Sequence, residues 1–229
     1  MILECIATSL SDARTIEAHG GGRIELVAGL PDGGFTPSDG LVRAVQASVK
    51  LPVAVMLRPT KQSFHYSDDD LAVMRRDALR FHELGVKHIV TGLLDQDGIA
   101  DIETLDKILA GTDYQVTFHR AIDESADVAA SLDRINVYPR ITHILTSLGP
   151  GKVEDNLDRL GWYAENARPK LILGSGIQHG NIRKLAERVQ SYHYDLHVGT
   201  ALRGGDAMQP VEGDALRRLV DELSDLERI

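Results

Sequence analysis

Eight short apolar segments recur along the chain, and segments with helical periodicity separate them. The strand-like segments span residues 2–7, 23–27, 53–57, 88–91, 115–118, 143–146, 170–173 and 195–198. Strands that alternate with helices pair in parallel through crossover connections. Eight such units are the number that a (β/α)8 barrel requires, and 229 residues suit one barrel. We therefore predict a single TIM-barrel domain over residues 1–229.

The helical segments carry their apolar residues at spacings of three and four. The segment after the third strand has Leu71, Met74, Ala78 and Phe81 on one face, and Ser67 precedes it as an N-cap. Two further apolar faces comprise Val153, Leu157, Leu160, Ala164 and Ala167 before Pro169, and Leu216, Leu219, Leu223 and Leu226 near the C-terminus. Each segment is predicted to form a helix that packs on the barrel.

The composition excludes several classes of partner. Asp and Glu (34) outnumber Lys and Arg (25), and the formal net charge of −9 would repel nucleic acids and anionic membranes. The single cysteine, Cys5, allows neither a disulfide nor a cysteine-based zinc site within one chain, and it suits a reducing cytosol. The N-terminus lacks the pattern of a signal peptide, and no segment has the ~18 apolar residues of a membrane span. We therefore expect a cytoplasmic protein.

Polar residues directly follow the fifth predicted strand. The apolar run ends at Phe118, and His119, Arg120 and Asp123 come next. The C-terminal ends of the strands form the functional face of a barrel. We predict that His119 transfers protons near neutral pH, because histidine has a reference pKa of about 6.5. Arg120 and Asp123 are predicted to lie at the rim of the same site.

Charged residues also lie within or directly after other predicted strands. Glu4 and His197 lie in the first and last strands, which pair when the barrel closes, so they are predicted neighbours. Glu25 and Arg58 lie on adjacent strands, and we predict an ion pair that keeps Glu25 ionised. Two interpretations stay open. These residues are ion pairs that fix the strand register, or they form a polar pocket in which Glu25 or His119 is the general base.

Glycine-rich loops follow the last two predicted strands. The first contains Gly174, Ser175 and Gly176, and the second begins with Gly199 and Thr200. In barrels these two loops often form a phosphate site, because glycines let backbone N–H groups approach an anion. The alternative is that the glycines only relieve crowding at the strand ends. The first interpretation predicts a small anionic ligand, bound with the help of Arg120.

The sequence predicts no metal site. The nine histidines are scattered, and the chain has no His-Glu-x-x-His motif and no cysteine pair. Met56 lies in an apolar strand and is expected to pack in the core. Trp162 and Tyr163 are expected to be packing or interface residues.

Several of these strings occur together in one known family. The sequences RIEL at residues 23–26, VMLRP at 55–59, FHYS at 64–67, TFHRAID at 117–123 and LTS at 145–147 follow one another in order. Over nearly its full length the chain resembles the CutC family, the copper homeostasis proteins. The resemblance implies a cytoplasmic barrel that forms a homo-oligomer, a dimer or tetramer, and that is associated with copper homeostasis through copper binding or handling.

The chain departs from that family at the positions proposed to bind copper(I). Ile6 and Val27 stand where those members have cysteines, and Cys5 is one residue out of register, which places it on the opposite face of the strand. Copper(I) prefers thiolate or thioether ligands. Copper(I) is therefore disfavoured as a cofactor, and we predict no tight site within one chain. The alternative function is a TIM-barrel enzyme that acts on a small phosphorylated or otherwise anionic metabolite.

Overall fold

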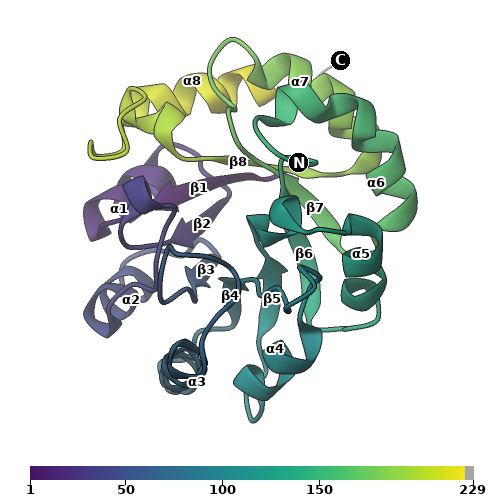
Figure 1. Cartoon of the computed structure of the whole chain (residues 1–229). Helices are drawn as coiled ribbons and strands as arrows, with labels where there is room; N and C mark the ends of the chain where they lie inside the picture. Colours follow the sequence, from purple (N-terminus) through teal and green to yellow (C-terminus); the bar gives the residue numbers. More distant parts are fainter. Residues whose placement is uncertain (225–229) are drawn as a thin grey trace.

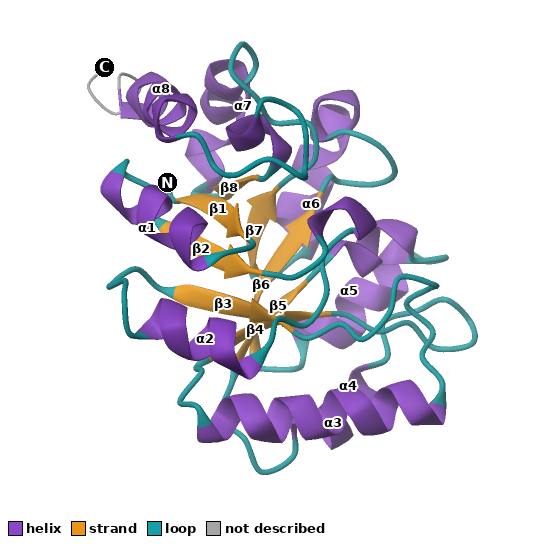
Figure 2. Ribbon diagram, turned by 90° about the vertical axis from the view of Figure 1, so that its left-hand side faces the viewer, coloured by secondary structure: helices purple, strands orange, loops and turns teal. Residues whose placement is uncertain are grey.

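The strands close into a barrel in which each strand pairs in parallel with its neighbours in the sequence, and the last strand pairs with the first. The computed structural model describes residues 1–224 (Figures 1 and 2). The strands are β1 (Leu3–Ala7), β2 (Arg23–Leu26), β3 (Val53–Met56), β4 (His88–Thr91), β5 (Gln115–Phe118), β6 (Ile141–Thr146), β7 (Lys170–Leu173) and β8 (Asp195–Val198). The predicted (β/α)8 barrel is confirmed, and the predicted strands agree with these bounds to within two residues.

Within residues 1–224, eight α-helices surround the barrel (Figure 1). They are α1 (Leu10–Ala18), α2 (Asp39–Gln46), α3 (Asp68–Glu83), α4 (Ile102–Leu109), α5 (Val128–Asn136), α6 (Leu160–Asn166), α7 (Ile182–Val189) and α8 (Gly213–Ser224). Ser67 caps α3 as predicted: its side chain accepts from the backbone N–H of Asp70, whose carboxylate accepts from the backbone of Ser67. Among the residues the structure describes, no helix has the length and hydropathy needed to cross a membrane.

The segment before Pro169 differs from the predicted helix. A 3-10 helix, η3 (Val153–Arg159), precedes the shorter α6. The side-chain amide of Asn156 donates to the carbonyl oxygens of Ser147, Pro150 and Lys152, and these bonds tie the first turn to the loop after β6. Such local bonds compete with a regular α-helix. In the predicted C-terminal helix, Leu226 lies outside the described residues.

Alternation along the strands separates two apolar layers. Cys5, Ile24 and Leu26 face outward and pack under the helices, in the larger of the two clusters. Inside the barrel a smaller cluster contains Ile6, Val27, Ala54, Met56 and Val90. The core position predicted for Met56 is confirmed. Cys5 is fully buried in the outer layer, one residue away from the inward-facing positions, as its register predicted.

The barrel interior also contains charges, which is unusual for a space commonly filled by branched apolar side chains. Arg23 forms ion pairs with Glu4 and Asp195, and Lys170 pairs with Asp195 at 2.7 Å. These side chains come from β1, β2, β7 and β8, so the network spans the point where the barrel closes. It ends directly below the site described next.

Candidate active site at the C-terminal ends of the strands

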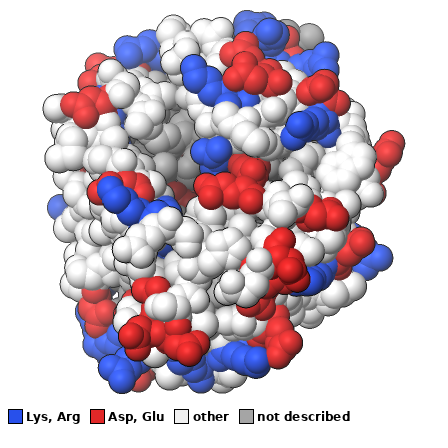
Figure 3. Space-filling model, in the orientation of Figure 1, with Lys and Arg blue, Asp and Glu red and all other residues white. Residues whose placement is uncertain are grey.

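A pocket of about 240 Å³ opens at the C-terminal ends of the strands. It is lined by residues of the strand tips and of the loops after them, among them Ile6, Glu25, Met56, Arg58, Phe64, His119, Arg120, Ser175, Gly176, His197, Gly199 and Thr200. An outer groove of about 750 Å³ adjoins it and shares Gly33, Arg58, Phe64 and Arg120. Figure 3, in the orientation of Figure 1, shows a hollow near the middle of the face with charged side chains around it.

A second cavity, of about 480 Å³, lies at the opposite end of the barrel, next to Ile2, Gly22 and Lys170. These residues precede or begin strands. The catalytic groups of barrel enzymes come from the other end, so the candidate site is the smaller pocket.

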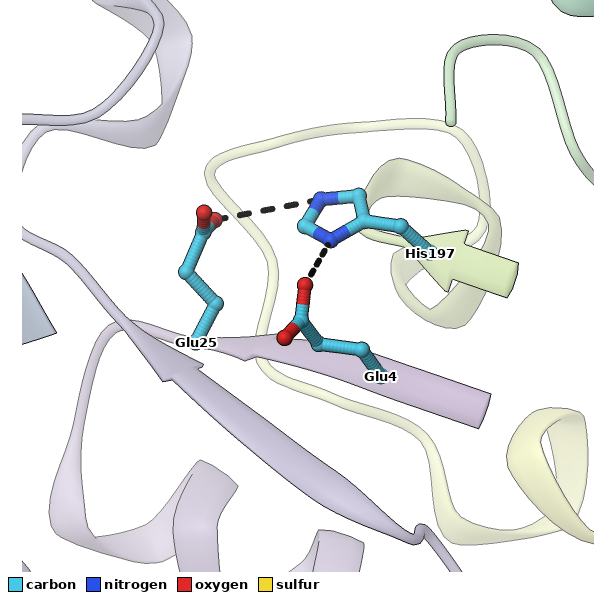
Figure 4. Close-up of side chains that lie close together, drawn as sticks. All are labelled: Glu4, Glu25 and His197. Carbon is cyan, nitrogen blue, oxygen red and sulfur yellow. Dashed lines mark hydrogen bonds and ion pairs between the residues drawn. The ribbon is translucent and has the colours of Figure 1, made fainter. Parts of the chain in front are cut away.

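His197 lies between two carboxylates in this pocket (Figure 4). Its Nδ1 is 2.8 Å from Oε1 of Glu4, and its Nε2 is 3.8 Å from Oε2 of Glu25. Strand pairing places Glu4 opposite His197, so the predicted contact is confirmed. The other oxygen of Glu4 accepts from Arg23. With both oxygens of Glu4 occupied, the imidazole is fixed and its Nε2 is directed toward Glu25.

The two carboxylates differ in their affinity for protons. Burial alone would raise the pKa of Glu4, but the hydrogen bond and charge of His197, together with Arg23, lower it to about 2. Burial raises the pKa of Glu25 to about 7; the charge of Glu4 adds to this rise, and the charges of His197 and Arg23 oppose it. Burial lowers the pKa of His197, but the charge of Glu25 and the contact with Glu4 outweigh it and raise the pKa. The pKa of Glu25 therefore lies near neutral pH, next to an imidazole whose own pKa is raised.

Charge balance in the buried network leads to the same conclusion. Three carboxylates, those of Glu4, Glu25 and Asp195, face the two fixed cations Arg23 and Lys170. The network is neutral when one proton resides on either Glu25 or His197. Isolated charge is costly in a buried site, so this single proton is retained and shared.

The predicted ion pair between Glu25 and Arg58 is wrong. Glu25 pairs in register with Ala54, and Arg58 comes four residues later on that chain segment, about 13 Å further along an extended strand. Arg58 donates instead to the carbonyl oxygen of Gly33 at 3.3 Å, and its guanidinium carbon lies 4.9 Å from the ring centre of Phe64. Glu25 therefore contacts His197 and not Arg58, and Oε1 of Glu25 has no hydrogen-bond partner within residues 1–224.

His119 lines the pocket as predicted, but its surroundings do not favour the proton-transfer role predicted for it. Burial, together with the positive charges of Arg58 and Arg120, lowers its pKa to about 3, so the ring is neutral at pH 7. Its Nδ1 accepts a hydrogen bond from the backbone N–H of Ala121 at 3.2 Å. The proton of the neutral ring is therefore on Nε2, which has no partner in the described part of the chain. This arrangement favours His119 as a hydrogen-bond donor over the base role.

Arg120 lines both the pocket and the groove, whereas Asp123 lines only the groove. The buried carboxylate of Asp123 accepts from the backbone N–H groups of Ser147 and Gly149, at 2.9 and 3.2 Å, and from the Thr146 hydroxyl. It also holds the Nε of Arg120 at 2.9 Å. The rim is therefore built on Asp123, which fixes the loop after β6 and orients Arg120 above it.

The residues of the two glycine-rich loops, after β7 and after β8, do not all contribute to the pocket. Ser175, Gly176, Gly199 and Thr200 line the pocket, but Gly174 does not. A Cβ atom at Gly174 would lie 3.0 Å from Leu145, and one at Gly199 would lie 2.7 Å from Ile6. Relief of crowding therefore accounts for Gly174 and for part of the role of Gly199. Ser175 and Gly176 have left-handed backbone conformations, with φ of 76° and 78°, and line the same pocket as Arg120.

A cation is a poor occupant for the acidic side of this pocket. Glu4, Glu25 and His197 each have a donor atom within 4.8 Å of the others. Glu4 is committed to His197 and Arg23, which leaves one carboxylate and one ring nitrogen of this set. Zinc sites in proteins use three or four protein ligands. The guanidinium of Arg23 also opposes a second positive charge nearby.

Fold and pocket together define the class: a (β/α)8-barrel protein with a polar pocket at the C-terminal ends of its strands. The sequence model of the CutC family matches residues 1–198. The chain belongs to the CutC family.

Relatives extend over most of the chain. The CutC family proteins of Salmonella agona and Salmonella dublin are each 32% identical over 191 residues, which is 81% of this chain and 75% of theirs. The CutC protein of Streptococcus agalactiae, to which its name attributes copper homeostasis, superposes with a TM-score of 0.78 at 27% identity and covers 87% of this chain and 98% of its own. Phosphoribosyl anthranilate isomerase of Thermus thermophilus shares the fold, with a TM-score of 0.58 at 15% identity, covering 99% of this chain and 100% of its own.

Proposed function

We propose that this protein is an enzyme that moves a proton on a small anionic metabolite held at the C-terminal end of the barrel. The observation that carries the proposal is the position of Glu25. Its carboxyl group is buried, lines the pocket, and has one oxygen without a partner among the described residues and the other 3.8 Å from His197. A carboxyl group with a pKa of about 7 is matched to proton transfer near neutral pH.

The three residues of Figure 4 have separate roles in this proposal. Glu25 removes a proton from the ligand and returns it. His197 stabilises the charge on Glu25 and exchanges a proton with it through Nε2. Glu4 contacts only the far side of the imidazole, and it is a positioning residue that keeps the Nδ1 proton in place.

The opposite wall of the pocket suits the anionic part of the ligand. Arg120 extends over the opening, held by Asp123 at 2.9 Å and by the Ser147 hydroxyl at 3.0 Å. Ser175 and Gly176, in the loop after β7, line the same pocket. Loops after the seventh and eighth strands are the usual place for a phosphate group in this fold. We therefore propose a phosphorylated ligand.

Thermal unfolding in the presence of phosphorylated compounds tests this function. Inorganic phosphate and a set of triose and pentose phosphates are added to the wild-type protein, and ¹H NMR in D₂O follows loss of carbon-bound hydrogen from the same compounds. A ligand at 100 times its Kd stabilises the fold by about 2.7 kcal/mol. We expect saturable stabilisation by at least one compound and exchange of one of its hydrogens.

Two variants separate binding from chemistry. Glu25→Gln should keep the stabilisation and lose the exchange by at least about 100-fold. Glu165→Gln, an exposed position on α6, removes the same charge outside the pocket and should change neither. The proposal fails if no compound stabilises the wild-type protein, or if exchange persists in Glu25→Gln.

Copper homeostasis is the second candidate function, because the Streptococcus agalactiae relative is named for it. The only cysteine, Cys5, is buried under the helices, and burial and the charge of Glu4 raise the pKa of its thiol. A thiolate ligand for copper(I) is disfavoured there. Anaerobic titration against a copper(I) chelator should find no tight site within one chain. One copper per chain, lost in Cys5→Ser, would show that this candidate is the better one.

Two further properties come with the family resemblance. We propose a cytoplasmic location, which a single unpaired cysteine fits. We also propose a homo-oligomer, for which Trp162, 40% exposed on α6, is a candidate contact. Tyr163, its neighbour, packs in the core instead. Sedimentation equilibrium of the wild type and of Trp162→Ala tests the assembly: a monomeric wild type would contradict it.

A further inference from the structure

Two hydrogen-bond donors without partners belong to side chains that line the same pocket as Glu25. His119 Nε2 and Arg58 Nε are both buried, and neither has a partner within residues 1–224. Both side chains line the pocket, and both contact the ring of Phe64, with centre distances of 4.8 Å for His119 and 4.9 Å for Arg58. Buried donors without partners are costly, so a cluster of them marks a place where a ligand atom is bound.

We propose that His119 and Arg58 form an oxyanion site, and that the substrate is a small phosphorylated compound with a carbonyl group next to the carbon that Glu25 deprotonates. This inference rests on the proposed function and specifies its substrate class and its reaction.

The local structure fixes His119 as a neutral donor. The backbone N–H of Ala121 donates to Nδ1, and a second proton on that atom would break this bond. His119 also begins the short 3-10 helix η2 (Arg120–Glu124), so its ring cannot turn without opening that turn. A neutral N–H donor binds a carbonyl oxygen and strengthens its bond as negative charge develops there.

Arg58 is held in a similar way. Its guanidinium lies between the rings of Phe35 and Phe64, at 5.8 and 4.9 Å from their centres. Its Nη1 donates to the carbonyl oxygen of Gly33, which leaves Nε directed away from that bond. The positive charge stabilises an oxyanion more than a neutral carbonyl oxygen, so it favours the transition state over the bound substrate.

The step conserves atoms and electrons. The carboxylate of Glu25 takes a proton from the carbon next to the carbonyl, and the C–H electron pair forms a carbon–carbon double bond. The carbonyl π pair moves to oxygen, where His119 and Arg58 donate hydrogen bonds to the enolate. The carboxylic acid of Glu25 then returns the proton to the same carbon, the double-bond pair forms the new C–H bond, and the oxygen pair restores the carbonyl group. No oxidant, reductant or second substrate is required.

The pocket limits the size of the substrate. Its volume of about 240 Å³ corresponds to roughly eight water molecules at ~30 Å³ each. A chain of a few carbons with one phosphate group fits this volume. A longer substrate would extend past Arg58 and Arg120 into the outer groove.

Calorimetric titration with three probes tests the oxyanion site. Phosphoglycolohydroxamate imitates a planar enediolate and carries a phosphate group; glycerol 3-phosphate has the same charge group and similar size but no carbonyl; inorganic phosphate reports the anion site alone. We expect the wild-type protein to bind the hydroxamate at least about tenfold more tightly than glycerol 3-phosphate, because only the hydroxamate has a planar group with a carbonyl oxygen that can accept from the two donors.

A matched pair of substitutions assigns the effect to one atom. Asn at position 119 can still accept from Ala121 but lacks a donor at the Nε2 position, whereas Gln places an amide N–H near that position. His119→Asn should reduce the preference to within about twofold, and His119→Gln should retain part of it. Arg58→Lys lacks the Nε–H group and should also reduce the preference, which provides a second measurement should His119→Asn fail to fold.

The outcomes distinguish this inference from the function on which it rests. If the wild type binds the hydroxamate and glycerol 3-phosphate with equal affinity, the proposal of an oxyanion site is wrong. The proposed function, an enzyme that binds an anionic metabolite, is not contradicted by that result. A full preference that persists in folded His119→Asn and in Arg58→Lys also overturns the oxyanion site. If none of the three probes binds, the proposed function fails and the inference fails with it.

Discussion

The Nδ1 atom of His197 lies 2.8 Å from Oε1 of Glu4, although the two residues are 193 positions apart in the sequence. Pairing of β8 with β1 places them opposite each other, and the bond crosses the point where the barrel closes. The same carboxylate accepts from Arg23 on β2. One buried side chain therefore connects barrel closure to the orientation of the group that contacts Glu25.

Glu4→Gln should destabilise the protein at pH 7 by about 3 kcal/mol, because Arg23 and His197 would lose a buried anionic partner. The pKa of Glu4 falls from 4.5 to about 2 on folding. A carboxyl with a lowered pKa stabilises the fold above pH 4.5, and this contribution is lost as the pH falls toward 2. Urea denaturation between pH 2.5 and 7 should show this acid dependence in the wild type and a weaker one in Glu4→Gln. Equal curves would contradict the assignment.

The stability that Glu25 contributes should change with pH in the opposite direction to the contribution of Glu4. A carboxyl whose pKa rises from 4.5 to about 7 stabilises the fold most below pH 4.5 and loses this contribution as the pH rises through 7. His197, whose pKa is also raised, acts in the same direction. The free energy of unfolding should therefore fall by on the order of 2 kcal/mol between pH 5 and pH 8. In Glu25→Gln the fall should shrink. The prediction is wrong if both proteins lose the same stability over this range.

Cys5 should be unreactive in the folded protein. Its side chain is fully buried, and burial raises the pKa of the thiol, so thiolate is scarce at pH 8. Labelling with a disulfide reagent should be at least about 100-fold slower in buffer than in concentrated urea, where the unfolded chain should react with one equivalent. Rapid labelling of the native protein would show that α1 opens away from β1 far more often than a packed helix does.

Arg203→Ala should cost about 3–5 kcal/mol of stability, because it leaves a buried carboxylate without its partner. The Nη2 of Arg203 donates to Asp12 at 2.8 Å and to the carbonyl oxygen of Ile6 at 3.0 Å, and both Arg203 and Asp12 are buried. The exposed ion pair of Arg183 with Glu187 is the control, and Arg183→Ala should change stability by less than about 1 kcal/mol. Similar urea midpoints for Arg203→Ala and Arg183→Ala would contradict the predicted difference between the buried and the exposed ion pair.

The fold was predictable because its pattern is local. Period-two strands and amphipathic helices alternate eight times, and Ser67 with Asp70 marks the start of α3 in the sequence itself. Inward and outward faces followed from alternation, which placed Glu4 and Cys5 on opposite sides. Arg23 is not among the site residues predicted from the sequence, although it lies two residues before Glu25 and therefore shares the same face of β2.

The electrostatics of the site could not be predicted in the same way. The pKa of His119 depends on burial next to Phe64, which belongs to a loop far away in the sequence, and on Arg58. Arg58 does not pair with Glu25, because residues on neighbouring strands interact only when they lie at the same height along the barrel. The sharing of one proton by Glu25 and His197 follows from the charges of Glu4, Arg23, Lys170 and Asp195 together. These residues lie on four different strands, so no single sequence motif contains them.

The bond between Glu4 and His197 also has a consequence during synthesis on the ribosome. β1 leaves the exit tunnel before β8, and His197 is added 193 positions after Glu4. Until then a nascent barrel that buried Glu4 would do so without one of its partners, which favours intermediates that keep the first strand hydrated and undocked. A chain that ended before β8 would have seven strands, an open seam and no fixed imidazole. Termination before β8 therefore yields a product that has neither the closed barrel nor the oriented side chain of His197.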